Sequence, residues 1–289
     1  VYYFIKSQAD TFDLKSLCRA VSVSRSAYYA WRKGQTYTCD EQQQGFMKKA
    51  EEVFIEHKRR YGSRRIVHEL RAAESIYVGR HRVRRWMSHL GLQAIQPRRF
   101  VPRTTNSRNT RQPSPNLLIE RDIAITRVNQ VWVGDITYLP LQGGKWLYLA
   151  TWIDLYSRTV VGWHLAENMR AELVGRALQK AIDVRRPPQG LILHTDRGSQ
   201  YASRAFRGLL KRHHFEQSMC RKADAYDNAV AESFFSRLKA EMLQGGIFQT
   251  LEDAQTELFP YIEAYYNRKR RHSALGYLSP MEFEQKHLF

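Results

Sequence analysis

Three segments rich in aromatic and β-branched residues follow one another between residues 131 and 166, and this pattern restricts the fold more than any other feature. They are "VWVGDITYLPL" (131–141), "KWLYLATWIDLYS" (145–157) and "TVVGWHLA" (159–166). Turn signals separate them, Gly143-Gly144 after the first segment and Ser157-Arg158 after the second. Strands of this composition joined by short turns predict an antiparallel meander.

Downstream of the meander, helical and strand patterns alternate. Helices are expected at 170–185, 203–215, 227–244 and 251–270, and strands at 190–196 and 216–220. A meander followed by alternating helix and strand is typical of an α/β or α+β sheet domain, and we predict the α/β class.

Positive charge is concentrated in the first part of the chain. The net charge is +18. Residues 1–115 hold 23 Lys and Arg against 9 Asp and Glu, whereas residues 116–289 hold 23 against 19. This asymmetry favours a nucleic acid held mainly by the N-terminal part, although a basic solvated surface is the alternative. The expected organisation is a helix-turn-helix-like segment (1–45), a second helical DNA-binding segment (46–96), a basic Pro-rich linker (97–118) and a sheet domain with C-terminal helices (119–289).

The segment 13–33 predicts two short helices separated at Val21-Ser22-Val23, the second with Ser24 as its N-cap. This is the pattern of a helix-turn-helix, in which the second helix enters the major groove of DNA. The predicted DNA contacts on that helix are Arg25, Ser26, Tyr28 and Tyr29.

A second pair of basic helices is predicted between residues 61 and 92. One helix has Ile66 and Leu70 on its apolar face, and the other has Val83, Trp86, Met87 and Leu90. Arginines on the remaining faces are expected to bind phosphate before bases, because phosphate contacts dominate such interfaces. They are Arg64, Arg65, Arg80, Arg82, Arg84 and Arg85, and the linker adds Arg98, Arg99 and Arg103.

Three acids occupy places where a sheet domain presents its edges. Asp135 lies within the first strand, Asp196 follows the apolar run at 191–193 in "HTDRGSQY", and Glu232 lies on the helix "DNAVAESFFSRLKAE". If the first and fourth strands are neighbours, Asp135 and Asp196 lie side by side and Glu232 approaches from the covering helix. On that helix Asn228, Glu232, Ser236 and Lys239 share a polar stripe.

Three carboxylates beside a basic groove suit phosphodiester cleavage. Two Mg²⁺ ions activate the attacking oxygen and stabilise the leaving one, and Mg²⁺ prefers hard oxygen ligands. The interval between Asp196 and Glu232 is not specific by itself, since roughly two acid pairs at that separation are expected by chance. Asp154 is interpreted as a turn or salt-bridge residue, and His194 as a buried, hydrogen-bonded histidine rather than a proton shuttle.

The three cysteines form no CxxC pair, which argues against a zinc knuckle and a disulfide framework and fits a reducing cytoplasm. No apolar stretch approaches the length of a membrane span. The expected location is therefore the cytoplasm.

Several sequence motifs decide between these interpretations. "NQVWVGDITYLP", "TWIDLYSR", "HTDRGSQY", "YDNAVAESFFSRLKAE" and "YNRKRRHSALGYLSPMEF" occur in this order, and "SRSAYYAWRK" and "YGSRRIVHELR" precede them. Together they resemble the downstream-frame (OrfB-like) transposases of bacterial insertion sequences of the insertion-sequence-three type, over nearly the whole chain. That family is similar to retroviral integrases. The resemblance implies a ribonuclease-H-like catalytic core.

Motif by motif, the resemblance places Asp135, Asp196 and Glu232 on the DDE triad of that family, and Lys239 on the basic residue after the glutamate. Lys239 and Asn228 are accordingly predicted to contact DNA. The resemblance also implies two Mg²⁺ ions, for which Mn²⁺ substitutes, and a homodimer or higher oligomer on paired terminal inverted repeats. Cys220 and Ala223 stand where the family usually has Ser and Gly. The expected leucine-zipper segment of a frameshifted fusion is not visible, which leaves room for an upstream-frame partner protein or a fused segment.

The predicted activity is DNA transposition, by Mg²⁺-dependent cleavage at the 3′ end of the element and then strand transfer. The resemblance implies that this transposition is of the copying type, passes through a circular intermediate and takes place at the nucleoid of a bacterial cell. Two alternatives are kept. One is a non-catalytic helix-turn-helix regulator, which has no reason to place Glu232 on a groove-facing helix beside two strand acids. The other is a plain Mg²⁺-dependent nuclease, which would cleave DNA without joining it.

Overall fold

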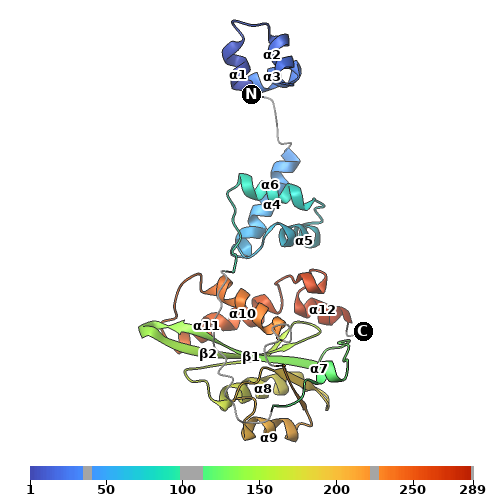
Figure 1. Ribbon diagram of the computed structural model, residues 1–289, viewed down its shortest axis with the longest axis vertical. Coiled ribbons are helices and arrows are strands. Elements are labelled where there is room, and N and C mark those ends of the chain that lie inside the picture. Colours follow the sequence, from blue (N-terminus) through green and yellow to red (C-terminus); the bar gives the residue numbers. More distant parts are fainter. Residues whose placement is uncertain (35–40, 98–112, 222–227, 288–289) are drawn as a thin grey trace. The chain divides into compact units, whose positions relative to one another are not determined.

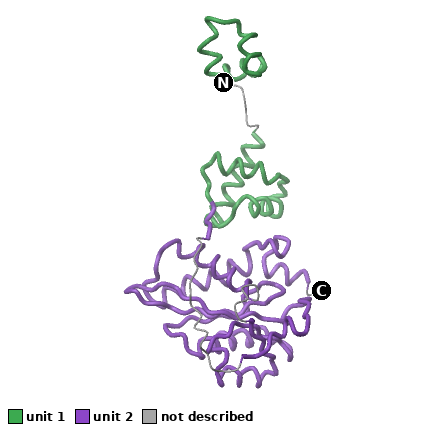
Figure 2. The backbone as a smooth tube through the Cα atoms, viewed as in Figure 1, with its two compact units in different colours: residues 1–93 green, residues 94–289 purple. Residues whose placement is uncertain are grey.

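The computed structural model describes residues 1–34, 41–97, 113–221 and 228–287. The chain forms two compact units, Val1–Gln93 and Ala94–Phe289 (Figure 2). Among the described residues, no helix is both long enough and apolar enough to cross a membrane.

The first unit is helical. It contains α1 (Tyr2–Gln8), α2 (Leu14–Ala20), α3 (Arg25–Arg32), α4 (Glu41–Glu56), α5 (Ser63–Glu74) and α6 (Arg80–His89). The first three helices share a small core of Ile5, Leu17, Cys18 and Tyr28. Ser24 caps α3 as predicted, since its hydroxyl accepts a hydrogen bond from the Ala27 N–H at 3.1 Å.

The second unit is built on a five-stranded mixed sheet with the order β3-β2-β1-β4-β5. The strands are β1 (Val131–Leu141), β2 (Lys145–Asp154), β3 (Val160–Ala166), β4 (Ile192–Thr195) and β5 (Glu216–Met219). The first three pair antiparallel, as predicted for the meander, and β4 pairs parallel with both β1 and β5. β2 ends at Asp154 rather than at residue 157, because the carboxylate of Asp154 accepts the N–H groups of Tyr156 and Ser157 and forms the turn.

Helices cover both faces of this sheet (Figure 1). On one face, α8 (Ala171–Arg185) and α9 (Arg204–Arg212) bury Trp132 and Trp152. On the other, α10 (Ala229–Met242) and α11 (Leu251–Phe259) pack on Val133 and Leu149. α7 (Leu117–Glu120) and α12 (Pro280–His287) complete the unit. Two hydrophobic layers around one sheet thus make the unit a mixed α/β domain of the predicted class.

Two segments differ from their predicted form. The helix predicted at 251–270 stops at Phe259, because Pro260 lacks an N–H, and continues as a π-helix over Pro260–Tyr266. The predicted linker at 97–118 falls mostly outside the described residues, but its last residues belong to the sheet unit. The Pro115 carbonyl accepts the Met219 N–H at 3.1 Å, and the Leu117 N–H donates to Ser218 Oγ at 3.0 Å.

Candidate active site

Asp135 and Asp196 lie at the point where β4 ends and β1 continues. The last registered pair between these parallel strands joins Gly134 to Thr195, so the two aspartates are the next residue on each strand. Both side chains are half-buried. The sheet therefore places two carboxylates side by side, as predicted from the strand pattern.

The pKa of Asp135 is raised to about 8. Burial is the largest cause, and the charge of Asp196 is the next; the N–H of Ile136, which donates to Asp135 Oδ1 at 2.8 Å, opposes them. Glu232 raises this pKa further and Lys239 lowers it, so these two groups and Asp196 lie within electrostatic reach of Asp135. A shift this large, caused by burial and by nearby acids, is typical of functional sites.

Asp196 is held by the turn that follows β4. The Gly198 N–H donates to Asp196 Oδ1 at 2.9 Å, which partly offsets the increase in the pKa of Asp196 that burial causes. A Cβ at position 198 would lie 2.9 Å from the same oxygen. A side chain at position 198 would therefore displace the carboxylate of Asp196.

Glu232 is presented by a packed helix. α10 buries Ala231, Phe234 and Leu238, whereas Glu232 is exposed. Burial of part of the side chain raises the pKa of Glu232. Within the described parts of the chain, the structure assembles no group of three or more His, Cys, Asp or Glu residues that could hold a metal ion. It brings Asp135 and Asp196 together and leaves Glu232 on α10 beside them.

A buried ion pair fixes the far end of α10. Arg270 Nη2 lies 2.6 Å from Glu241 Oε1, and the Tyr261 hydroxyl donates to Glu241 Oε2 at 2.9 Å. The basic motif near the C-terminus thus includes a structural arginine that ties the helix carrying Glu232 to the segment after α11. Sequence reasoning missed this role, because the motif looked like a basic surface.

Lys239 belongs to the same site. Its side chain is half-buried, and its Nζ lies 4.5 Å from the centroid of the Tyr138 ring. Burial lowers the pKa of Lys239, and the carboxylate of Asp135 raises it. Tyr138 was not predicted as a site residue. Tyr138 lies three residues after Asp135 in β1, which extends beyond the end of β4. That position is the signal that could have identified it.

Two predicted DNA contacts are corrected by burial. Tyr28 is only 1% exposed, because it fills the core between α1, α2 and α3. Asn228 is 7% exposed at the N-cap position of α10, so it does not share the open polar stripe with Glu232 and Ser236. Neither side chain is placed to contact DNA in this structure.

The remaining predicted contacts have these places. Arg25, Ser26 and Tyr29 are exposed on α3. On α5, Arg64 is exposed and Arg65 is half-buried, 5.7 Å from the centroid of the Tyr61 ring. The four arginines of α6 are all exposed, opposite Val83, Trp86 and Met87; they are Arg80, Arg82, Arg84 and Arg85. Arg98, Arg99 and Arg103 lie outside the described residues.

The interpretations of two other polar residues are confirmed. His194 is fully buried, with Nδ1 2.8 Å from Ser218 Oγ and Nε2 3.3 Å from Cys220 Sγ. Asp154 is a turn residue, whose Oδ2 also accepts the Asn129 N–H at 2.6 Å.

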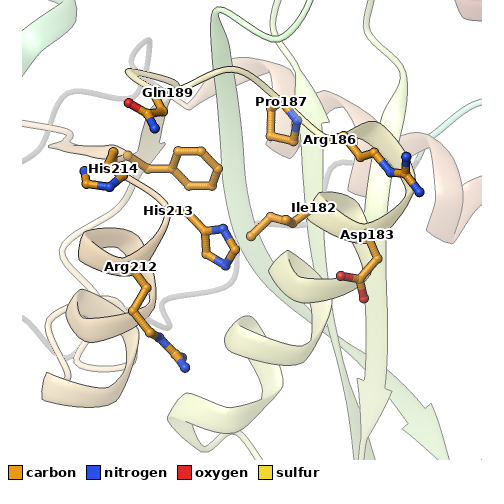
Figure 3. Close-up of a pocket in the computed structure, with 9 residues that line it drawn as sticks. Ile182, Asp183, Arg186, Pro187, Gln189, Arg212, His213 and His214 are labelled. Atoms are coloured by element: carbon orange, nitrogen blue, oxygen red, sulfur yellow. The ribbon is translucent and has the colours of Figure 1, made fainter.

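Figure 3 shows the lining of an open hollow of about 600 Å³ in the sheet unit. Residues from the ends of α8 and α9 line it, among them Arg186, Arg212 and His214. These residues precede β4 and β5, whereas Asp196 follows β4. The hollow is therefore at the opposite end of the parallel strands and is separate from the candidate active site.

Comparisons with known proteins agree with this architecture. The chain matches the family "Integrase core domain" over residues 125–225 and a second family of that description over residues 232–288, and it matches "HTH-like domain" over residues 41–100. Among solved structures, the HTLV-2 integrase catalytic core domain in complex with magnesium is similar at 17% identity and a TM-score of 0.42, covering 54% of this chain and 96% of that one.

The fold and the families define an integrase-type enzyme with a helix-turn-helix-like region. Transposase InsF for insertion sequence IS3A of Escherichia coli is 41% identical, over 99% of both chains. A 31 kDa protein of insertion element IS600 from Shigella sonnei is 41% identical over 94% of this chain and 98% of its own. The chain belongs to the family of IS3 transposases.

The raised pKa of Asp135 predicts how the stability of the protein depends on pH without divalent metal. Between about pH 4 and 8 the folded protein retains a proton on Asp135 that the unfolded chain has lost, so the free energy of unfolding falls as the pH rises. One such group contributes a slope of at most about 1.4 kcal/mol per pH unit. Asp135→Asn removes the titrating group and is expected to flatten this dependence and to stabilise the protein at pH 8.

Urea unfolding in EDTA at pH 5, 6.5 and 8 measures the effect. Asp183→Asn is the matched control, because Asp183 is an exposed acid of the same unit. Equal pH dependence of the wild type and Asp135→Asn would show that Asp135 ionises normally.

Proposed function

We propose that this transposase cleaves DNA at the 3′ ends of its element and transfers the freed strand, using Asp135, Asp196 and Glu232 as the catalytic carboxylates. The observation that carries this proposal is the pair Asp135 and Asp196, adjacent at the end of β4, with Glu232 and Lys239 within electrostatic reach. The resulting hydroxyl would attack a second phosphodiester in line. Because one phosphodiester is exchanged for another, the reaction needs no nucleotide hydrolysis.

The donor set fits magnesium. Asp135 and Asp196 are half-buried, burial raises the pKa of both, and the charge of Asp196 raises the pKa of Asp135 further. They offer hard oxygens and negative charge, which a divalent cation would neutralise. We propose that Asp135 and Asp196 hold the metal and that Glu232 completes the set from α10, for two Mg²⁺ ions with Mn²⁺ as a substitute. When bound, the metal supplies activation of the attacking oxygen and stabilisation of the leaving one.

Other residues of the chain hold the proposed catalytic carboxylates in position. The Ile136 and Gly198 N–H groups each fix one oxygen of an aspartate, and the Glu241–Arg270 pair fixes α10. The residues before 116 are proposed as the main DNA grip, through exposed basic side chains on α3, α5 and α6. We further propose action on terminal inverted repeats, as a dimer or higher oligomer on paired ends, with a circular intermediate and in the bacterial cytoplasm. An upstream-frame protein or fused segment is a further proposed partner.

One assay tests the activity. The protein is incubated with labelled end DNA and Mg²⁺, and the products are separated on a denaturing gel. Cleaved strands together with longer joined products are expected. Cleavage without joining would indicate a plain nuclease, and binding without either product would indicate a regulator.

Lys239 is expected to position the strand. Its ammonium lies near Asp135, where it can hold a phosphate beside the scissile one. Lys239→Ala is expected to lower cleavage at the correct nucleotide by about 10- to 100-fold, the scale typical of residues that support metal ligands, while affinity for end DNA falls less. Lys239→Arg keeps the charge but changes its geometry, and should restore part of the rate. Equal rates for all three proteins at low and moderate salt would exclude this role.

A further inference from the structure

The edge of β1 beyond the carboxylates is not covered by β4. The pairs between β1 and β4 stop at Gly134 and Thr195, whereas β1 continues to Leu141. Among the described residues, the next backbone contact on that side is with Phe248, whose N–H donates to the Pro140 carbonyl at 3.0 Å. A stretch of strand edge is thus presented directly beside Asp135, between the end of β4 and Phe248.

An aromatic pair lies on the hairpin that forms this edge. Tyr138 on β1 and Trp146 on β2 pack edge to face, with ring centroids 5.1 Å apart and planes at 83°. Trp146 is 46% exposed, whereas Tyr148, the next residue on the same face of β2, packs against the core under α8. Figure 1 shows the β1–β2 hairpin extending past α8. The hydrophobic face of the sheet therefore continues from the core onto an open surface.

The ammonium group of Lys239 lies near both the aromatic pair and Asp135, one of the proposed catalytic carboxylates. Lys239 lies over the Tyr138 ring at 4.5 Å and is within electrostatic reach of Asp135. Lys239 thus links the aromatic pair to the acid, through its contact with the Tyr138 ring and its electrostatic effect on Asp135. A cation next to an exposed aromatic face matches the two parts of a nucleotide, because phosphate binds the cation and the base stacks on the ring.

We propose that Trp146 and Tyr138 form a base-stacking platform that holds one unpaired nucleotide of the DNA strand, with its phosphate at Lys239. This inference rests on the proposed function and adds to it a site for a base beside the cleavage point. Stacking uses the π-face that every base has, so the platform binds any of the four bases. It does not bind an abasic nucleotide in the same way, because that nucleotide has no ring to stack. Trp146 is the base-binding residue, and Tyr138 positions both the indole and the ammonium.

The test combines Trp146→Ala with DNA that lacks single bases. End DNAs carry an abasic site at successive positions around the cleavage point, and affinity and cleavage rate are measured for each. With intact DNA, Trp146→Ala is expected to weaken binding of the cleavage-competent complex about 5- to 150-fold, the range for loss of one stacked base. At one position, the abasic site should reproduce this loss in the wild type and cause no further loss in Trp146→Ala.

A fluorescent base gives a second readout that does not need catalysis. 2-Aminopurine at the sensitive position should be quenched by the wild type, less by Trp146→Phe and not by Trp146→Ala. Phe259→Ala is the matched control, since Phe259 is an exposed aromatic on α11 of the same unit, and it should behave like the wild type. Melting temperatures of the variants show that each is folded.

The outcomes separate this inference from the proposed function. If losses from Trp146→Ala and from abasic sites add independently at every position, the platform does not exist, even though joining by the wild type would leave the catalytic proposal intact. If Trp146→Ala changes only self-association of the protein, the surface binds another protein chain and the inference is overturned. Quenching without any joined product would support the platform and refute the proposed chemistry.

Discussion

Replacing Asp135 or Asp196 by Asn, or Glu232 by Gln, is expected to lower cleavage and strand joining by at least about 10³-fold while DNA affinity stays within a few-fold of the wild type. Loss of one preorganised electrostatic group costs about 10²–10³ in rate. Each of these carboxylates is proposed to hold metal that would serve both the attacking and the leaving oxygen, so its loss should reach at least the upper part of that range. DNA affinity is preserved because most of the excess positive charge lies before residue 116.

The control for this series is again Asp183→Asn, which removes one exposed acid from the same unit and should keep full activity. The pattern across the three sites is informative as well. Asp135 and Asp196 are adjacent in the structure, whereas Glu232 is exposed on α10. Joining by Glu232→Gln at nearly the wild-type rate would restrict the catalytic group to the two aspartates.

The sheet and its two aspartates were predictable because they depend on local patterns. The β-branched and aromatic segments gave the meander, and the apolar run before Asp196 gave a strand that ends in an acid. The two aspartates lie side by side only if β4 pairs with β1. The structure shows this pairing. Residues whose environment is set by the next element along the chain are accessible to this kind of reasoning.

Tyr28, Asn228 and Tyr138 show where it fails. Periodicity identified the helix of Tyr28 but not which of its sides packs, and Tyr28 is buried. Asn228 is also buried, because it is the N-cap residue that precedes α10 and so does not continue the polar stripe of that helix. Tyr138 is part of the site because it contacts Lys239, which is 101 positions away in the chain, and because the pairing of β4 with β1 stops before it. The buried Glu241–Arg270 pair is hidden from sequence for the same reason, since a basic run reads as surface unless its partner is known.

A fragment of residues 1–112 is expected to bind end DNA by itself, with an affinity that falls about 10³- to 10⁵-fold between 50 and 200 mM salt, as for six to ten phosphate contacts. The fragment keeps 23 Lys and Arg against 9 Asp and Glu, and it leaves Pro115 and α7 with the sheet unit. Fluorescence anisotropy at several salt concentrations gives the slope. If a fragment of residues 113–289 bound as tightly as the full chain, the main grip would lie in the sheet unit.

The exposed arginines of α6 allow the slope to be assigned to particular side chains. Each of Arg80, Arg82, Arg84 and Arg85 that contacts phosphate should, when replaced by Gln, reduce the magnitude of the slope of log affinity against log salt by about 0.9. Lys49→Gln is the matched control, since Lys49 Nζ lies 3.1 Å from Glu52 and 3.4 Å from Glu74 and its charge is largely balanced within the protein. An unchanged slope in all four arginine variants would remove α6 from the interface, and the grip would then have to come from α3, α5 or the basic segment after residue 97.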